Sequence, residues 1–525
     1  MNDQPLTLTE DTQRRYRRLG LLALAVIIGY KLAMVLALPL GQLVHYVYDD
    51  VLYYLKIGQN LAAGRGFTFD GLHQTNGFHP LWQLVCALPH LLGIGVEWSY
   101  RLILTLNYLL AAYSLILLHR LVNRRYGERT GLFVIICLSW PMIIHNIGSG
   151  MEMAIALPLL LTAVELADRH ALLRLESLPR IEWAVGILLG LVFLARLDTA
   201  FLHLTAGIYF LLSFIRDRQR HGGWSGFIRR GLRLFAPTMI ALVGLLLWNQ
   251  LTFGHLLPLS GSLKTSFPVP GFFYGNLLIF RELGILGLAA LVWFAARHRR
   301  QGPLVGILAW GYLLFLAYNV FFIHWAAFPY YAVALGVPLL ALFGGDVFSA
   351  FFERRRWLRL SLTILAAAAV VAGHVISFSQ RGADFHRAAY EGALWARRNT
   401  PPGTVFAMRD AGIFGYFSQR PTINLDGLVN DYDYQRVLAE GRLAEYFRNN
   451  RVEFFAHHAL MSKGLESFTL ELPSRLHGGG DSITVRADQR VFLSDPYSYI
   501  FDERVFWMGI YDIGQPGPFT STDGN

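Results

Sequence analysis

Long apolar runs, separated by short polar or basic stretches, fill the first 380 residues of the chain. A run of about 20 apolar residues can cross a bilayer as a helix, because each helical residue advances about 1.5 Å. The first run extends from about residue 19 to 40. Further spans are predicted near residues 100–118, 130–146, 151–167, 181–197, 200–215, 234–251, 283–296, 304–323, 328–345 and 360–378. The pattern therefore predicts a polytopic α-helical membrane protein with about 11 transmembrane helices.

Arginine clusters orient these spans. Arg14, Arg15, Arg17 and Arg18 precede the first run, so the positive-inside rule places the N-terminus in the cytoplasm. The run lacks a small-residue cleavage site and many spans follow, which favours an uncleaved anchor over a cleaved signal peptide. Residues 81–93 form a run too short for a span, and counting it as one would place Arg120–Arg129 outside. We therefore expect an interfacial or re-entrant helix there and a C-terminus that faces outward.

The character of the sequence changes near residue 381, where glycine, proline and charged residues interrupt shorter patterns. Helix-like stretches at 384–398 and 432–449 alternate with strand-like stretches at 404–408, 422–425 and 452–457. This alternation predicts a small α/β domain. The expected organisation is a transmembrane domain at 1–380, whose residues 41–98 form the first outer loop, and an extracytoplasmic domain at 381–525.

Composition supports the membrane class. The chain is 54% hydrophobic and 16% charged, which is too apolar for a soluble globular protein. The net charge of +10 does not indicate nucleic-acid binding, because the basic residues lie in short clusters between apolar runs. Cys86 and Cys137 both lie in apolar runs, so we interpret them as packing residues.

Two adjacent carboxylates, Asp49 and Asp50, directly follow the first span. Ionisable groups at a membrane boundary are costly to desolvate, so a functional role is their default interpretation. Either carboxylate could act as a general base, and the pair could also hold a divalent cation.

Further polar residues gather at the predicted outward turns. They include the substrate-binding candidates Asn76, Glu152 and Asp198, and the phosphate-binding candidates His79, Arg196, His255 and Lys264. A set of polar residues on one side of a helical bundle predicts a cavity that is open to the outer leaflet. Arg196 with Asp198 is equally consistent with a structural ion pair, and His255 with an interface hydrogen bond. The Lys264 loop does not match a phosphate loop, because no glycine directly precedes the lysine.

Carboxylates beside cations at such a cavity suit glycosyl transfer from a lipid-linked donor. The reaction needs a base for the acceptor hydroxyl and positive charge for the departing phosphate. Outside the cytoplasm nucleotide sugars are not available, so the donor would be a sugar on a polyprenyl phosphate.

Several motifs resemble a known group of enzymes. They are Tyr48-Asp49-Asp50, Asn60–Gly66, Gly77–Trp82, Ser149–Glu152, Phe253–Ser260 with Lys264, and Gly412–Leu428. Together with the arrangement of spans and outer loop, they resemble GT-C membrane glycosyltransferases, in particular arabinofuranosyltransferase B and its bacterial relatives. The resemblance implies an inverting enzyme of the bacterial cytoplasmic membrane. It would transfer a sugar, with arabinofuranose as one candidate, to a cell-envelope glycan or lipid on the outer face. It further implies that Asp49 or Asp50 is the base and that Tyr416 and Asp426 bind the acceptor.

A lipid flippase or solute transporter is the main alternative. It predicts ionisable groups near the bilayer midplane and internal sequence symmetry, and the sequence shows neither. An outer-facing binding protein on a membrane base is a third class, which leaves Asp49 and Asp50 without a role.

Overall fold

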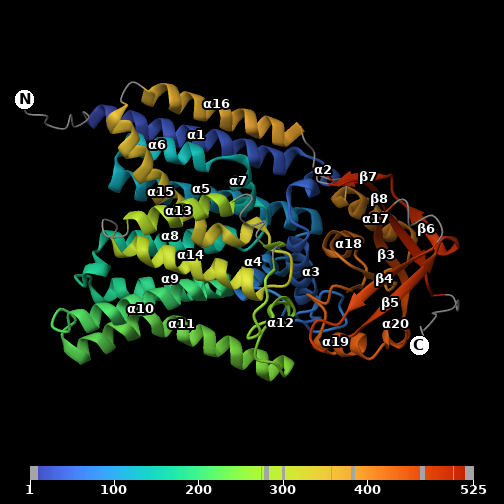
Figure 1. Ribbon diagram of the computed structural model, residues 1–525. Coiled ribbons are helices and arrows are strands. Elements are labelled where there is room, and N and C mark those ends of the chain that lie inside the picture. Colours follow the sequence, from blue (N-terminus) through green and yellow to red (C-terminus); the bar gives the residue numbers. More distant parts are fainter. Residues whose placement is uncertain are drawn as a thin grey trace, which may run out of the picture. The chain divides into compact units, whose positions relative to one another are not determined.

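The computed structural model describes residues 10–273, 275–276, 283–297, 302–355, 358–379, 385–460, 467–499 and 502–514 (Figure 1). Residue 384, where a helix-like stretch was predicted to begin, lies outside this range, as do residues 515–525. The chain forms two compact units. The first, here called the helical unit, comprises Met1–Met34, Leu104–Gly244 and Ser266–Ser379. The second, here called the α/β unit, comprises Val35–Ile103, Leu245–Thr265 and Gln380–Asn525.

The helical unit contains the predicted spans, and a helix lies at each of them. These helices are α1 (Glu10–Ala37), α5 (Val96–Tyr126), α6 (Glu128–Leu138), α7 (Pro141–Gly148), α8 (Met153–Arg169), α9 (Pro179–Ala195), α10 (Ala200–Arg216), α11 (Gly223–Phe253), α13 (Leu283–Arg297), α14 (Pro303–Phe322), α15 (Val333–Arg354) and α16 (Leu358–Ser379). Helices α1, α5 and α11 extend into the other unit. The predicted span at 130–146 is the pair α6 and α7, which bends by 73°.

Within the described residues, seven helices are long and apolar enough to cross a membrane, or eight if the bent pair counts as one span. Helices α8 and α9 have 17 residues each and α13 has 15. A polytopic helical membrane protein is thus confirmed. The number of about 11 crossings and their orientation remain predictions.

Local sequence explains where several helices begin and how they pack. Prolines occupy the first turn of α7, α9 and α14, where the missing N–H has no helical partner to lose. Glycines in α9 allow a close approach to α11. A Cβ added at Gly186 would lie 2.1 Å from the Arg233 carbonyl oxygen, and one at Gly190 would lie 3.2 Å from the Pro237 carbonyl oxygen. Small residues at helix contacts are typical of membrane bundles.

The α/β unit joins the predicted outer loop to the C-terminal region. Its helices are α2 (Leu40–Leu43), α3 (Asp50–Ala62), α4 (Pro80–Leu91), α12 (Leu259–Lys264), α17 (Phe385–Asn399), α18 (Gly412–Ser418), α19 (Tyr432–Ala439) and α20 (Leu443–Asn449). Helix α4 corresponds to the short apolar run predicted as interfacial. It packs closely on α3, where a Cβ at Gly58 would lie 2.8 Å from the Ala87 Cα.

A six-stranded mixed sheet forms the centre of the C-terminal region. Strands β2 (Thr422–Asn424), β1 (Val405–Met408), β3 (Val452–Leu460), β8 (Asp502–Asp512) and β6 (Arg490–Leu493) lie in that order, and β7 (Tyr497–Tyr499) also pairs with β8. Strand β1 runs parallel to β2 and β3, whereas β8 is antiparallel to its neighbours. A separate hairpin consists of β4 (Ser467–Pro473) and β5 (Gly480–Arg486). The predicted strands at 404–408, 422–425 and 452–457 correspond to the three parallel strands.

The stretch 432–449, predicted as one helix, forms two. Helix α19 ends at Ala439 and α20 begins at Leu443, with Gly441 between them at φ +63°. This left-handed conformation suits glycine and interrupts a helix. Both helices then pack on the sheet, where Tyr434 and Phe447 belong to the same hydrophobic core as Phe455 of β3.

Candidate functional site

The acidic doublet lies where α3 begins, against the C-terminal region of the α/β unit. Asp49 immediately precedes α3, and Asp50 is the first helical residue. The Asp49 carboxylate accepts two backbone hydrogen bonds from the start of α18, from Gly412 N–H at 2.8 Å and from Ile413 N–H at 2.7 Å. Each carboxylate oxygen takes one of these bonds, which fixes the orientation of the Asp49 side chain.

Two further carboxylates lie just beyond the ends of the parallel strands β1 and β2. Asp410 follows β1 by two residues, and Asp426 follows β2 by two residues. The Asp426 carboxylate accepts the Asp410 N–H at 2.7 Å and the Arg409 Nε–H at 3.2 Å. In open α/β sheets, ligands bind outside the carboxyl ends of the strands, and both acids lie at that edge.

Tyr53 and Asn424 connect the two groups of acids. The Tyr53 hydroxyl accepts the Ala411 N–H at 3.0 Å and an Asn424 Nδ2–H at 3.3 Å. Asn424 Nδ2 also lies 3.3 Å from Asp426 Oδ2. The Asn424 Oδ1 atom is buried and has no hydrogen-bond partner. A buried acceptor without a partner is unfavourable and needs an explanation, such as a ligand that donates to it.

These four residues, Asp49, Asp50, Asp410 and Asp426, are here called the acid cluster, and its electrostatics raise the pKa values of Asp49 and Asp410. Burial raises the pKa of Asp49 well above its usual value, and the charges of Asp410 and Asp50 raise it further, although hydrogen bonds from Ile413 and Gly412 oppose this. Although Asp410 is exposed as a whole residue, burial of its carboxyl group raises its pKa to about 7, and the nearby charges of Asp426 and Asp50 contribute to this rise. Carboxyl groups with raised pKa values are typical of sites that exchange protons.

Asn76 fixes the loops beside this cluster. Its side chain donates to Asn249 Oδ1 at 3.0 Å and accepts the Leu259 N–H at 2.9 Å, and it is buried. Its amide therefore holds the end of α11 and the start of α12 together. His79 is half-buried and directly precedes α4.

The predicted cations of the 253–265 segment lie in the same unit. Lys264 is the last residue of α12 and is half-buried. The preceding residue, Leu263, packs against Gly427, which is adjacent to Asp426. His255 is exposed and stacks on Tyr432 with 3.7 Å between ring centroids.

Tyr416 lies inside the unit. Its ring is fully buried, and its hydroxyl donates to the Val96 carbonyl at 2.7 Å and lies 3.3 Å from His90 Nε2. These contacts attach α18 to the start of α5 and account for the side chain structurally.

Glu152, Arg196 and Asp198 form a cluster within the helical unit. The Arg196 guanidinium pairs with the Glu152 carboxylate, and its Nε lies 2.8 and 3.0 Å from the two Asp198 oxygens. Its carbon Cζ lies 4.6 Å from the ring centroid of Tyr331. Glu152 is 1% and Arg196 4% exposed. One cation thus meets two carboxylates, which favours the structural interpretation of Arg196.

Among the described residues, no group of three or more His, Cys, Asp or Glu side chains is placed to hold a metal ion. Each Asp49 oxygen accepts one backbone N–H, and a divalent cation held by Asp49 and Asp50 remains a prediction.

Sequence reasoning missed Asp410, Tyr53 and Asn424. A signal was present for Asp410, because a carboxylate directly after a strand of an α/β domain marks the ligand edge of the sheet. Tyr53 lies within a mostly apolar helix, and nothing local distinguishes it from a packing residue.

Comparisons with known proteins bear on the fold. Residues 380–497 match the family described as "Domain of unknown function (DUF8728)". A search of curated proteins finds no match. Among solved structures, the chain is similar to ArnT from Cupriavidus metallidurans bound to undecaprenyl phosphate. The TM-score is 0.56 and the identity 13%, over 97% of this chain and 100% of that chain.

Two further structures are similar. ArnT from Cupriavidus metallidurans in the apo state has a TM-score of 0.50 at 14% identity, over 78% of this chain and 88% of that chain. The archaeal oligosaccharyltransferase AglB from Archaeoglobus fulgidus, in complex with an inhibitory peptide and a dolichol-phosphate, has a TM-score of 0.46 at 14% identity, over 84% of this chain and 70% of that chain. The similarity to ArnT confirms the predicted GT-C-like membrane fold. A specific likeness to arabinofuranosyltransferases remains a prediction.

Proposed function

We propose that this protein is an inverting glycosyltransferase of the bacterial cytoplasmic membrane. It transfers a sugar from a polyprenyl-phosphate donor to a cell-envelope glycan or lipid acceptor on the extracytoplasmic face. The observation that carries this proposal is the meeting of the acidic doublet with the strand edge of the α/β unit, where four carboxylates lie close together. The fold is shared with ArnT, a protein whose solved structure holds undecaprenyl phosphate.

The two members of the doublet take different roles. Both Asp49 oxygens accept backbone hydrogen bonds, which favours Asp49 as the residue that positions α18. Asp50 is then the general base. It takes the proton of the acceptor hydroxyl while the hydroxyl oxygen attacks the anomeric carbon of the sugar. The bond from that carbon to the phosphate oxygen breaks, polyprenyl phosphate leaves, and the configuration inverts.

The surrounding residues bind the two substrates. Lys264, His79 and His255 are the candidates that stabilise the departing phosphate, because all three belong to the α/β unit with the doublet. Asp426 and the unpartnered Asn424 Oδ1 are candidates to accept hydrogen bonds from the hydroxyl groups of a sugar. A hydroxyl donor would satisfy the buried Asn424 oxygen.

The test is turnover by the purified full-length protein, reconstituted in sealed liposomes with a panel of polyprenyl-phosphate sugars. The release of free polyprenyl phosphate is measured for the native protein and for Asp50→Asn, Asp49→Asn and Asp433→Asn. Asp433 is an exposed carboxylate of α19 paired with Arg436, so its substitution is the matched control.

Asp50→Asn should lower turnover by about 100-fold or more, the range that a general base contributes, with a smaller loss of thermal stability than Asp49→Asn. Asp49→Asn should lower both turnover and stability, and Asp433→Asn neither. Turnover that persists in both doublet variants would contradict the assignment of the base. Movement of the lipid donor across the bilayer without any release of polyprenyl phosphate would support the transporter alternative instead.

A further inference from the structure

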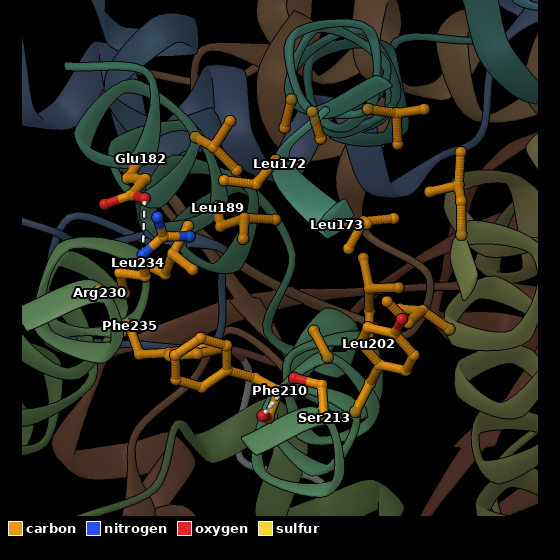
Figure 2. A pocket seen from close by; sticks show the side chains of 18 of the residues that line it. Leu172, Leu173, Glu182, Leu189, Leu202, Phe210, Ser213, Arg230, Leu234 and Phe235 are labelled. Atoms are coloured by element: carbon orange, nitrogen blue, oxygen red, sulfur yellow. Dashed lines mark hydrogen bonds and ion pairs between the residues drawn. The ribbon is translucent and has the colours of Figure 1, made fainter. Parts of the chain in front are cut away.

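A cavity of about 110 Å³ lies within the helical unit, among α8, α9, α10, α11 and α14. Its walls are almost entirely apolar, and Figure 2 shows Leu172, Leu189 and Leu202 around it with Phe210 and Phe235 on the α10 and α11 side. About 10–15 Å³ of such space holds one water molecule, so the cavity has room for a row of several heavy atoms. The shape and lining suit part of a hydrocarbon chain.

Charged side chains line one end of this cavity. The Arg230 guanidinium donates to the Leu175 carbonyl through Nη2 at 2.7 Å, and its Nε lies 3.6 Å from Glu182 Oε1 (Figure 2). Arg233 Nη1 lies 2.8 Å from the other Glu182 oxygen, and the Ser177 hydroxyl also donates to Glu182. Two arginines thus share one buried carboxylate, which leaves a net positive charge.

One nitrogen of Arg230 has no partner. Arg230 Nη1 is buried and makes no hydrogen bond, although it belongs to a charged group. A buried guanidinium N–H without an acceptor is costly, and arginine matches phosphate oxygens in both charge and geometry. An anionic oxygen at Nη1 would satisfy it.

From this arrangement we infer that the cavity binds an anionic glycerophospholipid, with its phosphate at Arg230 and part of one acyl chain between the helices. Basic pockets between membrane helices are suited to anionic headgroups. The site is distinct from the Arg196 cluster. Glu182 lies near the start of α9 and Arg196 directly follows its end, about 20 Å away along the helix. The inference does not depend on the proposed reaction, because lipid binding is measured without turnover.

The experiment uses the full-length protein, purified in detergent and stripped of bound lipid. Binding of phosphatidylglycerol is measured by native mass spectrometry and by the shift of the thermal unfolding midpoint, with phosphatidylcholine, inorganic phosphate and undecaprenyl phosphate as comparisons. The variants are Arg230→Gln, the cavity-filling Ala206→Phe, and Arg229→Gln as control, since Arg229 is the exposed neighbouring arginine of α11.

Phosphatidylglycerol should bind the native protein and Arg229→Gln equally, and Arg230→Gln about tenfold or more weakly, as expected for the loss of hydrogen bonds to a charged group. Ala206→Phe retains the charge but should also lose binding, while its unfolding midpoint without lipid reports whether it still folds. The inference would be overturned by equal binding of phosphatidylcholine, by an equal shift with inorganic phosphate alone, or by undiminished binding to Arg230→Gln. Tighter binding of undecaprenyl phosphate at the same residues would also overturn it.

Discussion

Asp49 and Gly412 are joined by a hydrogen bond of 2.8 Å although 363 positions separate them in the sequence. The backbone of the two segments approaches so closely that a Cβ on Gly412 would lie 2.2 Å from the Asp49 carbonyl oxygen and 2.7 Å from its Oδ2. Both residues belong to motifs on which the predicted GT-C resemblance was based. The contact explains in physical terms why a glycine stands at the start of α18.

The first prediction concerns this contact. Gly412→Ala should lower the stability of the protein by about 1–3 kcal/mol, because the added methyl group overlaps backbone and carboxylate atoms of Asp49. The measurement is the free energy or midpoint of unfolding of the purified protein. Gly403→Ala is the control, since a Cβ there meets nothing within 4 Å. Equal effects of the two substitutions would contradict the prediction.

The second prediction concerns the pH dependence of turnover. Asp410 belongs to the acid cluster with Asp49, Asp50 and Asp426. Its negative charge raises the pKa of Asp49. Asp410→Asn removes a negative charge, so the remaining carboxyl groups should lose their protons at lower pH. The acid limb of the pH profile of kcat/KM should therefore move to lower pH. A limb that stays in place or moves upward would show that Asp410 does not influence the base.

The third prediction concerns the buried ion pair of the helical unit. Glu152→Gln should destabilise the protein by about 1.5–3 kcal/mol, because the buried Arg196 loses one charged hydrogen-bond partner while Asp198 still pairs with it. Glu152→Gln combined with Arg196→Met removes both charges and should cost less than the sum of the two single changes. Thermal unfolding of the three variants measures the coupling. Additive effects would mean that the pair contributes no mutual stabilisation.

The fourth prediction concerns a histidine that links the segment between α3 and α4 to α20. His73 Nδ1 lies 2.7 Å from Asp70 Oδ2, and the His73 ring stacks on Tyr446. Burial lowers the pKa of His73, but the hydrogen bond and charge of Asp70, with the charge of Asp431, outweigh it and raise the pKa above 6.5. A raised pKa means that the charged form is stabilised by folding.

The contribution of His73 is therefore complete below about pH 6.5, the unfolded value, and is lost as pH rises through the higher folded value. The unfolding midpoint of the native protein should exceed that of His73→Gln at pH 5.5 by more than it does at pH 9. His477→Gln is the comparison for a histidine outside this contact. A difference that does not vary with pH would contradict the assigned pairing.

The membrane helices could be predicted from sequence because the hydrophobicity that forms them is local. An apolar run of sufficient length between arginine clusters predicts a helix without knowledge of its neighbours, and the predicted spans all coincide with helices. The strands at 404–408, 422–425 and 452–457 were also recognisable from local pattern. The break at Gly441 was missed, because a single glycine does not by itself end a predicted helix.

The composition of the candidate site could be predicted only in part. Asp49 and Asp50 were identified because charge at a membrane boundary is visible in the sequence, and this remains the basis of the proposed function. Asp410 was overlooked although its place after a strand was a local signal. Tyr53 and Asn424 were not identified, because their relevance depends on hydrogen bonds across more than 350 positions. Such pairings depend on how separate elements pack, and no local pattern encodes them.

The sequence by itself determined the class of protein, most element positions and the acidic doublet, since each follows from hydrophobicity and charge along a short stretch. Only the tertiary structure decided that α3 meets the ends of β1 and β2 and that Arg196 pairs with two carboxylates. It also decided that Arg230 has an unpartnered nitrogen beside an apolar cavity. The physical reason is that a side chain's hydrogen bonds and burial are set by neighbours distant in sequence, whose positions follow from the packing of the whole unit.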